Sequence, residues 1–398
     1  MFVFIILFII SFYLILRAII KIKFHFWSVQ PVFHIYDIHH WLRPNRIIDT
    51  ALPSMNKYVN VLDIHTEAID TMSEADVSAF CDFIKDNFLR NKSICAEYLP
   101  DERHIIEYMK GTNHKSYVSV YRRPQIISNV SKPTSTSIST DDIYSVISAR
   151  ALYITFRNAK PFPIYYIDNL CVNPAMRKKG IAPKAIQTLH YHLRQKNKNV
   201  STFLFKREGE MTAIVPLTTF ECRGYEVNTI KTVELPHASM AVIEVTGENL
   251  VLFVDFVKSM MATLECVIVP EVTNIANVIK CNNISIRGII EHGKLIAAYV
   301  FRDAATIYQG DRALEVICSL SACPFNDIFY AGFSVALHAC CKEWGCKKLL
   351  IDGLGDNTLI SKYLCDHAIV PFLVSPSAFF LYNYVSYTFP PDKCFFVC

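Results

Sequence analysis

The stretch YYIDNLCVNPAMRKKGIAPKAIQTLHYHLRQ, residues 165–195, decides the fold class of this sequence. Ile164–Val172 is apolar and aromatic and lies between Pro163 and Pro174, a pattern typical of a central strand. Pro183 suits the first turn of a helix, where an N–H donor is not needed. Side chains then recur at helical spacing at Ile186, Leu189, His190 and Leu193. The stretch therefore predicts a buried strand, a short loop and a helix.

The loop in this stretch is basic and reads Arg177-Lys178-Lys179-Gly180-Ile181-Ala182. Gly180 allows a tight turn and a close approach of the backbone to a ligand. The start of a helix offers unpaired N–H groups and a positive dipole end, which together suit a pyrophosphate. A solvated run of charge has the same composition, so the residues alone leave both interpretations open.

Three segments resemble known acyltransferases. The pattern R-x-x-G-x-A after a strand resembles the acyl-CoA pyrophosphate loop of the GNAT superfamily. Leu170-Cys171-Val172, followed by Arg177, Lys179 and Ala182-Pro183, resembles the signature of eukaryotic N-myristoyltransferase, which has two GNAT folds in one chain. Phe24–Val32 is similar to that family's CoA-binding segment near the N-terminus. Phe380-Leu381-Tyr382-Asn383-Tyr384, which ends 14 residues before the C-terminus, is similar to its closing strand.

The resemblance implies a fold and a domain division. We expect an α/β (α+β) chain of two tandem GNAT-like halves, with mixed sheets flanked by helices and a transmembrane helix in front. Residues 1–20 would be the anchor, residues 21–235 the acyl-CoA-binding half and residues 236–398 the peptide-binding half. A length of 398 residues fits about two domains.

The resemblance also implies an activity, the transfer of a myristoyl group from myristoyl-CoA to the N-terminal glycine of acceptor proteins. The backbone N–H groups of Asn169 and Leu170 would polarise the thioester carbonyl, an effect typically worth about 3–4 kcal/mol. The α-carboxylate of Cys398 would accept the proton of the amine, which is worth roughly 10²–10⁴ in rate. The acyl-CoA-binding positions correspond to His25, Phe26, Trp27, Asn169, Leu170, Cys171, Val172, Arg177, Lys178, Lys179, Gly180, Ile181 and Ala182.

Three stretches depart from the family pattern. Asn169 stands where the family has Phe, which keeps a backbone donor but changes the pocket wall. The basic stretch Leu89-Arg90-Asn91-Lys92-Ser93 stands where the family has an acidic loop. Val374-Ser375-Pro376-Ser377 stands where the family has Gly-Asp-Gly. The resemblance therefore supports the acyl-CoA half more strongly than the acceptor half.

Two other functions remain open at this stage. A catalytically silent relative would bind acyl-CoA or an N-terminal peptide as a scaffold at a membrane. A GNAT acetyltransferase would keep catalysis but use a shorter acyl donor. A long apolar tunnel behind Leu170 would favour the myristoyl chain, whereas a plugged tunnel would favour acetyl.

The N-terminus predicts a membrane anchor. Met1–Leu16 is an apolar run without a charged side chain, and residues 18–20 extend it to about the 20 residues that a span needs. A cleaved signal peptide and a buried core helix are the alternatives, although no small-residue cleavage site follows. Arg17, Lys21 and Lys23 flank the run on its C-terminal side, so the body is expected on the cytosolic face of the membrane.

Composition excludes few functions but indicates in which redox compartment the protein works. A net charge of +4 gives no basis for nucleic-acid binding. The 14 cysteines lie in apolar contexts without regular spacing, which indicates reduced thiols in a cytosolic-type compartment. We expect the protein to be a monomer. His338, Cys340, Cys341 and Cys346 lack a C-x-x-C pair, so we expect core thiols and no metal. The placement of His and Asp residues in the sequence does not support a nucleophilic role for Cys171.

The remaining elements are expected from local pattern. Ser73 with Asp76 indicates the N-cap of a helix. Tyr144–Phe156 is expected to be a strand beside Ile164–Val172. Asp327–Lys342 is expected to be a helix of the second half. The Ser/Thr-rich residues 128–142 are expected to form a loop.

Overall fold

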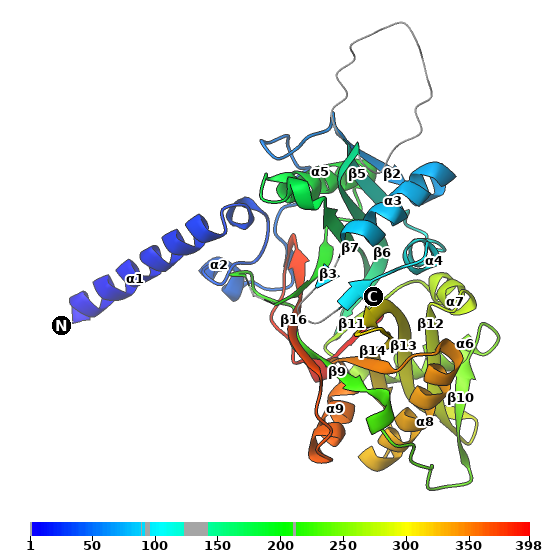
Figure 1. The fold of residues 1–398 in the computed structure, drawn as a ribbon. Coiled ribbons are helices and arrows are strands. Elements are labelled where there is room, and N and C mark those ends of the chain that lie inside the picture. Colours follow the sequence, from blue (N-terminus) through cyan, green and yellow to red (C-terminus); the bar gives the residue numbers. More distant parts are fainter. Residues whose placement is uncertain (1, 89, 92–95, 123–141, 210–211) are drawn as a thin grey trace, which may run out of the picture.

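The strand, loop and helix that the sequence predicts are present in the computed structural model (Figure 1), as β7 (Phe162–Val172) and α5 (Ile181–Lys196). A short 3-10 turn at Pro174–Met176 lies between them. The structure describes residues 2–88, 90–91, 96–122, 142–209 and 212–398. Most of the predicted loop at residues 128–142 lies outside this set, as do Leu89, Lys92 and Ser93 of the basic stretch.

The described strands form one large mixed sheet that runs through both parts of the chain. Among the described residues it has 16 strands. Its main path, in order, is β10 (Met240–Val245), β12 (Ile284–Glu291), β13 (Lys294–Tyr308), β14 (Asp311–Ser321), β15 (Lys348–Asp352), β9 (Thr218–Glu226), β16 (Leu373–Tyr382), β8 (Phe203–Glu208), β7, β6 (Ile143–Phe156), β11 (Cys266–Val269) and β18 (Cys394–Phe396). Side strands are β2 (Ile64–Ala68) and β5 (Tyr117–Arg122) beside β6, and β3 (Arg90–Asn91) and β4 (Ala96–Tyr98) beside β13. A separate two-stranded pair joins β1 (Arg46–Ile47) to β17 (Tyr384–Val385).

Helices flank the sheet on both faces. The described helices besides α5 are α1 (Phe2–Lys23), α2 (Ile38–Leu42), α3 (Glu74–Asn87), α4 (Arg103–Ile106), α6 (Leu250–Met260), α7 (Val272–Lys280), α8 (Asn326–Trp344) and α9 (Asn357–Asp366). The predicted N-cap of α3 is confirmed, because the side chain of Ser73 accepts from the backbone N–H of Asp76. Alternate residues of β13 face opposite helices: Tyr299 and Phe301 pack with α8, whereas Ala298 and Val300 pack with α6 and α7.

Strands cross between the two parts of the chain. β9 pairs with β15 and β16, and β11 and β18 lie on the edge formed by β6. The division at residues 235 and 236 stays a prediction. Strands from before the division pair directly with strands from after it, as β9 does with β15 and β6 does with β11. The last strand, β18, therefore lies near the centre of the molecule, where Figure 1 places the C label.

The N-terminal helix α1 extends away from the body (Figure 1). It has 22 residues and is long and apolar enough to cross a membrane. Ile20 is its one buried residue, so α1 is not a core helix of the described structure. The C-terminal half of α1 contacts the body, through Tyr13, Leu16, Arg17 and Ile20.

Candidate functional site

The site is organised around a break in the pairing of β6 and β7. The register pairs Val146 with Cys171 and Ser148 with Asp168, so that Asn169 and Leu170 together oppose one residue of β6. This is a β-bulge, which bends a strand and disturbs its ladder hydrogen bonds. Asn169 has a φ of 53°, a backbone conformation that Asn adopts more readily than most residues. The bulge therefore sets the two predicted carbonyl-polarising residues apart from the regular ladder.

The bulge is held by its own side chains. Asn169 Nδ2 donates to Ser148 Oγ at 2.9 Å. The backbone N–H of Asn169 donates to Asp168 Oδ1 at 2.8 Å. A carbonyl oxygen that used this N–H would have to replace the Asp168 carboxylate. The sequence pattern did not single out Asp168.

An apolar cavity lies on one side of the bulge. Its volume is about 240 Å³. β7 runs beside β8 only from Tyr165 to Ile167, and the cavity lies beyond that point, between β7, β8 and α5. Apolar lining residues are Ile147, Leu170, Ile186, Leu189, Leu193 and Phe205. The sequence left open whether an apolar space lies behind Leu170, and this cavity is such a space.

His190 is one of the ionisable residues that line this apolar cavity. Its ring packs edge-on against Phe203 and Tyr382, with centroids 5.2 and 4.9 Å away. Burial lowers the pKa of His190 to about 3, so the imidazole is neutral at physiological pH. The cavity therefore holds no cation at this position.

A charged cleft lies on the other side of the bulge. Its volume is about 590 Å³, and its charged lining includes Arg150, Lys206, Arg302, Asp168, Glu208 and Glu315. The apolar cavity and the charged cleft share five lining residues, namely Phe88, Ile167, Asp168, Asn169 and Lys206. The two spaces therefore meet at the bulge.

The C-terminus reaches the charged cleft through Arg302. Nη1 of Arg302 donates to the backbone oxygen of Cys398 at 2.8 Å, and this oxygen belongs to the terminal carboxylate. Cys398 is 8% exposed, so the terminus is not a free surface end. Burial raises the pKa of the Cys398 thiol to about 11, and the thiol is therefore protonated.

Buried ions of both signs line the floor of the charged cleft. Arg302 donates to Glu315 Oε2 from Nε at 2.8 Å and from Nη2 at 2.6 Å. Burial alone raises the pKa of Glu315, but Arg302 and Lys206 outweigh burial and hold the pKa below its ordinary value. Lys206 Nζ lies 2.9 Å from Asp352 Oδ2. The floor is thus a set of matched charges rather than a patch of one sign.

Arg150 is different, because no described residue hydrogen-bonds to its guanidinium. It is 6% exposed and lies over the rings of Tyr108 and Tyr166, at 5.0 Å from each centroid. Such cation–π contacts favour the charge but leave the N–H donors free for an oxygen ligand. Arg150 is a functional candidate that local sequence pattern could not identify.

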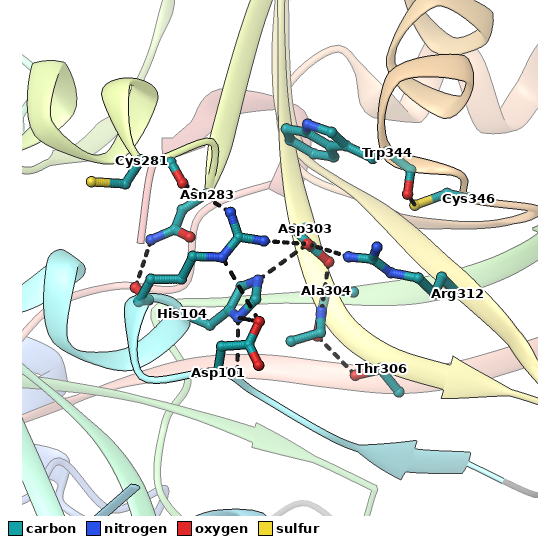
Figure 2. A network of polar contacts seen from close by, with 12 residues as sticks. Asp101, His104, Cys281, Asn283, Asp303, Ala304, Thr306, Arg312, Trp344 and Cys346 are labelled. Atoms are coloured by element: carbon teal, nitrogen blue, oxygen red, sulfur yellow. Dashed lines mark hydrogen bonds and ion pairs between the residues drawn. The ribbon is translucent and has the colours of Figure 1, made fainter. Parts of the chain in front are cut away.

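Asp303 organises the wall of the charged cleft (Figure 2). His104 Nε2 lies 3.1 Å from Asp303 Oδ2, Arg312 Nη2 donates to the same oxygen at 2.7 Å, and the N–H of Ala305 donates to Oδ1 at 3.0 Å. Burial raises the pKa of Asp303, but these hydrogen bonds outweigh burial and lower it overall. Through its contact with His104, the Asp303 carboxylate therefore connects α4 to the irregular part of β13.

The basic loop lies at the start of α5 as predicted. Gly180 is the N-cap, has a φ of 73° and has no side-chain cap hydrogen bond. Lys178 and Lys179 are exposed. Arg177 already donates from Nη2 to the backbone oxygen of Asn87 at 3.0 Å and from Nε to that of Val172 at 3.2 Å. Its guanidinium thus braces the loop, which sequence reasoning did not anticipate.

The predicted N-terminal CoA-binding residues lie beside the apolar cavity. Trp27 lines the cavity and stacks on Phe205, with ring centroids 5.4 Å apart. Phe26 packs edge-on against Trp27 at 5.1 Å. His25 is exposed, and its Nε2 lies 3.3 Å from the Nζ of Lys57. Trp27 and Leu170 therefore line the same cavity although they are far apart in the sequence.

Cys171 and Val172 lie away from the apolar cavity. Cys171 packs in the core cluster beneath α3, and burial raises the pKa of its thiol to about 12. It is therefore a protonated core thiol and not an activated nucleophile. Cys340, Cys341 and Cys346 are buried core thiols as well. Among the described residues no group of three or more His, Cys, Asp or Glu could hold a metal ion.

Comparison with solved structures finds the same architecture in N-myristoyltransferase. The fold matches Saccharomyces cerevisiae N-myristoyltransferase with bound myristoyl-CoA, with a TM-score of 0.68 and 14% identity over 92% of this chain and 94% of that one. A second structure of the yeast protein, with bound myristoyl-CoA and inhibitors, matches with the same TM-score and 15% identity over 96% of both chains. The protein therefore has the N-myristoyltransferase fold, and at this identity the likeness is one of fold. No protein-family model and no curated protein matches the sequence.

Proposed function

We propose that this protein transfers a myristoyl-like acyl group from its CoA thioester to the N-terminal glycine of a protein. The observation that carries this proposal is the meeting of the apolar cavity and the charged cleft at the Asn169–Leu170 bulge. A fatty acyl chain needs an apolar space and an attacking amine needs a polar one, joined at the reacting carbonyl. An acetyl group would leave the apolar cavity unused, so its lining favours a long acyl donor.

The donor is proposed to bind along the strand, loop and helix that define the fold. The uncapped N–H groups at the start of α5, with Lys178 and Lys179, suit the pyrophosphate of CoA. Phe26 and Trp27 lie beside the apolar cavity that would take the acyl chain. The yeast structures that share this fold contain myristoyl-CoA, which supports the same class of donor here.

The chemical step needs a polarised carbonyl and a neutral amine. The N–H groups of Asn169 and Leu170 would donate to the thioester oxygen once Asp168 turns away from Asn169. The terminal carboxylate of Cys398 would accept a proton from the glycine ammonium. The free amine then attacks the carbonyl carbon and the C–N bond forms. The C–S bond breaks, and CoA leaves as a thiolate that takes up the proton released by the attacking nitrogen.

The anchor is part of the proposal. α1 would hold the protein in a membrane, with the body on the cytosolic side, because Arg17, Lys21 and Lys23 follow the apolar run. Fatty acyl-CoA and acylated proteins both partition to membranes. An anchored enzyme would therefore act where its donor and its product accumulate.

The test is acyl transfer by the full chain in detergent micelles. Radiolabelled myristoyl-CoA and acetyl-CoA are each offered with a panel of Gly-starting peptides and with Ala-starting versions of the same peptides. Transfer of myristate to the Gly peptides alone is expected. Transfer from acetyl-CoA without transfer from myristoyl-CoA would replace this proposal with an acetyltransferase.

A chain extended by one glycine after Cys398 tests the proton acceptor. Extension moves the carboxylate away from Arg302, so transfer should fall by roughly 10²–10⁴. Binding of myristoyl-CoA to the extended chain reports whether the fold survives. Normal transfer by the extended chain would rule out the terminal carboxylate as the base.

A silent acyl-CoA-binding scaffold is the second candidate, and two contacts favour it. The N–H of Asn169 is already bonded to Asp168, and the terminal carboxylate is already bonded to Arg302. Tight binding of myristoyl-CoA with no transfer to any Gly-starting peptide would support this candidate over the enzyme.

A further inference from the structure

We propose that the protein has a second lipid-contacting surface besides α1, formed by Ile35, Ile38, Trp41 and Leu42 and called here the interfacial face. Its occupant is the headgroup and upper acyl region of the same bilayer that α1 crosses. The inference rests on the proposed membrane anchoring and goes beyond it, because it fixes how the folded body sits on the membrane.

The interfacial face is apolar and uncovered by the described residues. Ile38 is 59% exposed, Leu42 75% and Trp41 40%. The five-residue helix α2, IHHWL, brings Ile38, Trp41 and Leu42 together, and Ile35 lies just before it. Contiguous exposed apolar side chains on a soluble surface mark a contact with another apolar phase.

Trp41 has the chemistry of a residue at a membrane surface. Its Nε1–H donates to the backbone oxygen of Ile35 at 3.1 Å, so the polar edge of the ring is satisfied internally. One part of the ring packs against Phe33, with centroids 4.8 Å apart, and the rest is open. Because the N–H is already paired, the open part of the ring can enter an apolar phase without losing a hydrogen bond, and Trp is a residue type enriched at membrane surfaces.

α1 is docked directly onto this part of the body. Tyr13 Oη donates to the backbone oxygen of Tyr36 at 3.0 Å. The guanidinium of Arg17 lies 5.6 Å from the centre of the Tyr36 ring. Leu16 and Ile20 pack in the same small cluster as Tyr36. Tyr36 lies between Ile35 and α2, so the interfacial face begins at the docking point.

The length of α1 sets the depth of that docking point. A span needs about 20 residues for a hydrocarbon core of about 30 Å. α1 has only 22 residues, so nearly all of them up to Lys21 are needed. Tyr13 precedes Lys21 by eight residues, which is about 12 Å along the helix axis. The body segment bonded to Tyr13 is therefore held on the membrane side of Lys21, close against the bilayer.

The charges around the interfacial face agree with this placement. Arg43, directly after α2, is exposed and positioned for lipid phosphates. The one acidic group of this segment is Asp37, and its Oδ2 accepts from the N–H of His34 at 3.0 Å. The segment thus presents apolar and cationic groups to the outside.

The placement has a consequence for the donor. Trp27, which lines the apolar cavity, follows the last residue of α1 by four positions. The part of the apolar cavity lined by Trp27 is therefore held close to the membrane, near acyl-CoA that has partitioned into the bilayer. The interfacial face would fix the body in this orientation instead of letting it swing on α1.

Fluorescence quenching by brominated lipids tests the interfacial face in the full chain. The protein is placed in nanodiscs made with and without lipids brominated on the acyl chains. The chain has three tryptophans, so Trp41→Phe and Trp344→Phe can be compared with the parent. Trp344 ends α8 in the other part of the molecule and is the matched control.

We expect bromine to quench Trp41 and also Trp27, because Trp27 lies four residues after α1. The quenched fraction should therefore fall in Trp41→Phe and should not fall in Trp344→Phe. Equal quenching in the parent and in Trp41→Phe would overturn the interfacial face and leave the anchor intact. Failure of the parent chain to enter nanodiscs would overturn the anchor and the interfacial face together.

A second pair of variants keeps Trp41 as the reporter. Leu42→Asp places a charge on the interfacial face, and Val370→Asp places the same charge at a comparably exposed position, 81% exposed, after α9. Leu42→Asp should reduce the bromine quenching of Trp41, because a carboxylate is expelled from the interface, whereas Val370→Asp should not. Equal quenching in the two variants would count against the proposal.

Discussion

Replacing Arg302 by Met should destabilise the fold more than replacing its partner Glu315 by Met. Arg302 makes two hydrogen bonds to Glu315 and one to the terminal carboxylate of Cys398. Arg302→Met therefore leaves two buried carboxylates without their cation, and breaking a buried pair in this way costs about 3–5 kcal/mol. Glu315→Met leaves Arg302 with the terminal carboxylate and loses charged hydrogen bonds, which costs about 1.5–3 kcal/mol.

The double variant separates the two contributions. In Arg302→Met/Glu315→Met, the Glu315 charge is gone but the terminal carboxylate has still lost Arg302. Its cost should therefore lie between those of the single variants, which makes the coupling at least as large as the cost of Glu315→Met, about 1.5–3 kcal/mol. The measurement is urea unfolding of the full chain in detergent, followed by tryptophan fluorescence.

Arg223→Met is the control, because its pair with Glu221 is largely at the surface, with side chains 32% and 51% exposed, and should cost less than about 1 kcal/mol. Two results would refute the reasoning. Equal costs for Arg302→Met and Glu315→Met would mean that the terminus does not depend on Arg302. Additive costs in the double variant would mean that the two side chains do not act as a pair.

Four further predictions concern other parts of the site. Burial lowers the pKa of His190 to about 3, so the unfolded chain, with a pKa of 6.5, binds a proton that the folded chain does not. Stability is full above pH 6.5 and falls as the pH drops, by about 2 kcal/mol at pH 5, and His190→Leu should remove this contribution to the pH dependence of unfolding. Ile186→Trp fills the apolar cavity and should abolish myristoyl transfer while sparing shorter acyl donors, as measured with a chain-length series of acyl-CoAs. At Gly180 a Cβ meets open space but φ is 73°, so Gly180→Ala strains only the loop and should raise the KM for acyl-CoA more than it lowers kcat. Arg150→Met should raise the KM for the acceptor peptide and leave acyl-CoA affinity unchanged in a binding titration, because Arg150 lines the charged cleft and not the apolar cavity.

Local pattern predicted the elements whose cause is local. The strand before Pro174 and the helix after Gly180 follow from apolar periodicity. Pro174 restricts the backbone where the strand ends, and Gly180 allows the turn that starts the helix. The N-cap at Ser73 follows from a hydroxyl three residues before an N–H that needs an acceptor. These interactions join residues only a few positions apart, so they can be predicted from the sequence alone.

The charged cleft could not be predicted in the same way. Arg302 meets Glu315 because β13 and β14 pair in one register, and it meets Cys398 because the last strand returns to β11. The bulge at Asn169 exists only relative to β6. Each of these contacts depends on strand register, which no single stretch specifies. Asp168 illustrates the limit, because its role next to Asn169 depends on the direction of one side chain.

The three resembling segments are informative together because the fold brings them into contact. Tyr382, from the closing strand, donates from Oη to Gln30 Oε1 at 2.8 Å, and its Oη lies 3.3 Å from His190 Nδ1 on α5. The N–H of Asn383 donates to the backbone oxygen of Pro31 at 2.6 Å. Segments near the beginning, middle and end of the chain therefore build one wall around the apolar cavity. A change in any one of them alters the packing of the other two, so their joint presence in order carries more structural information than any one motif.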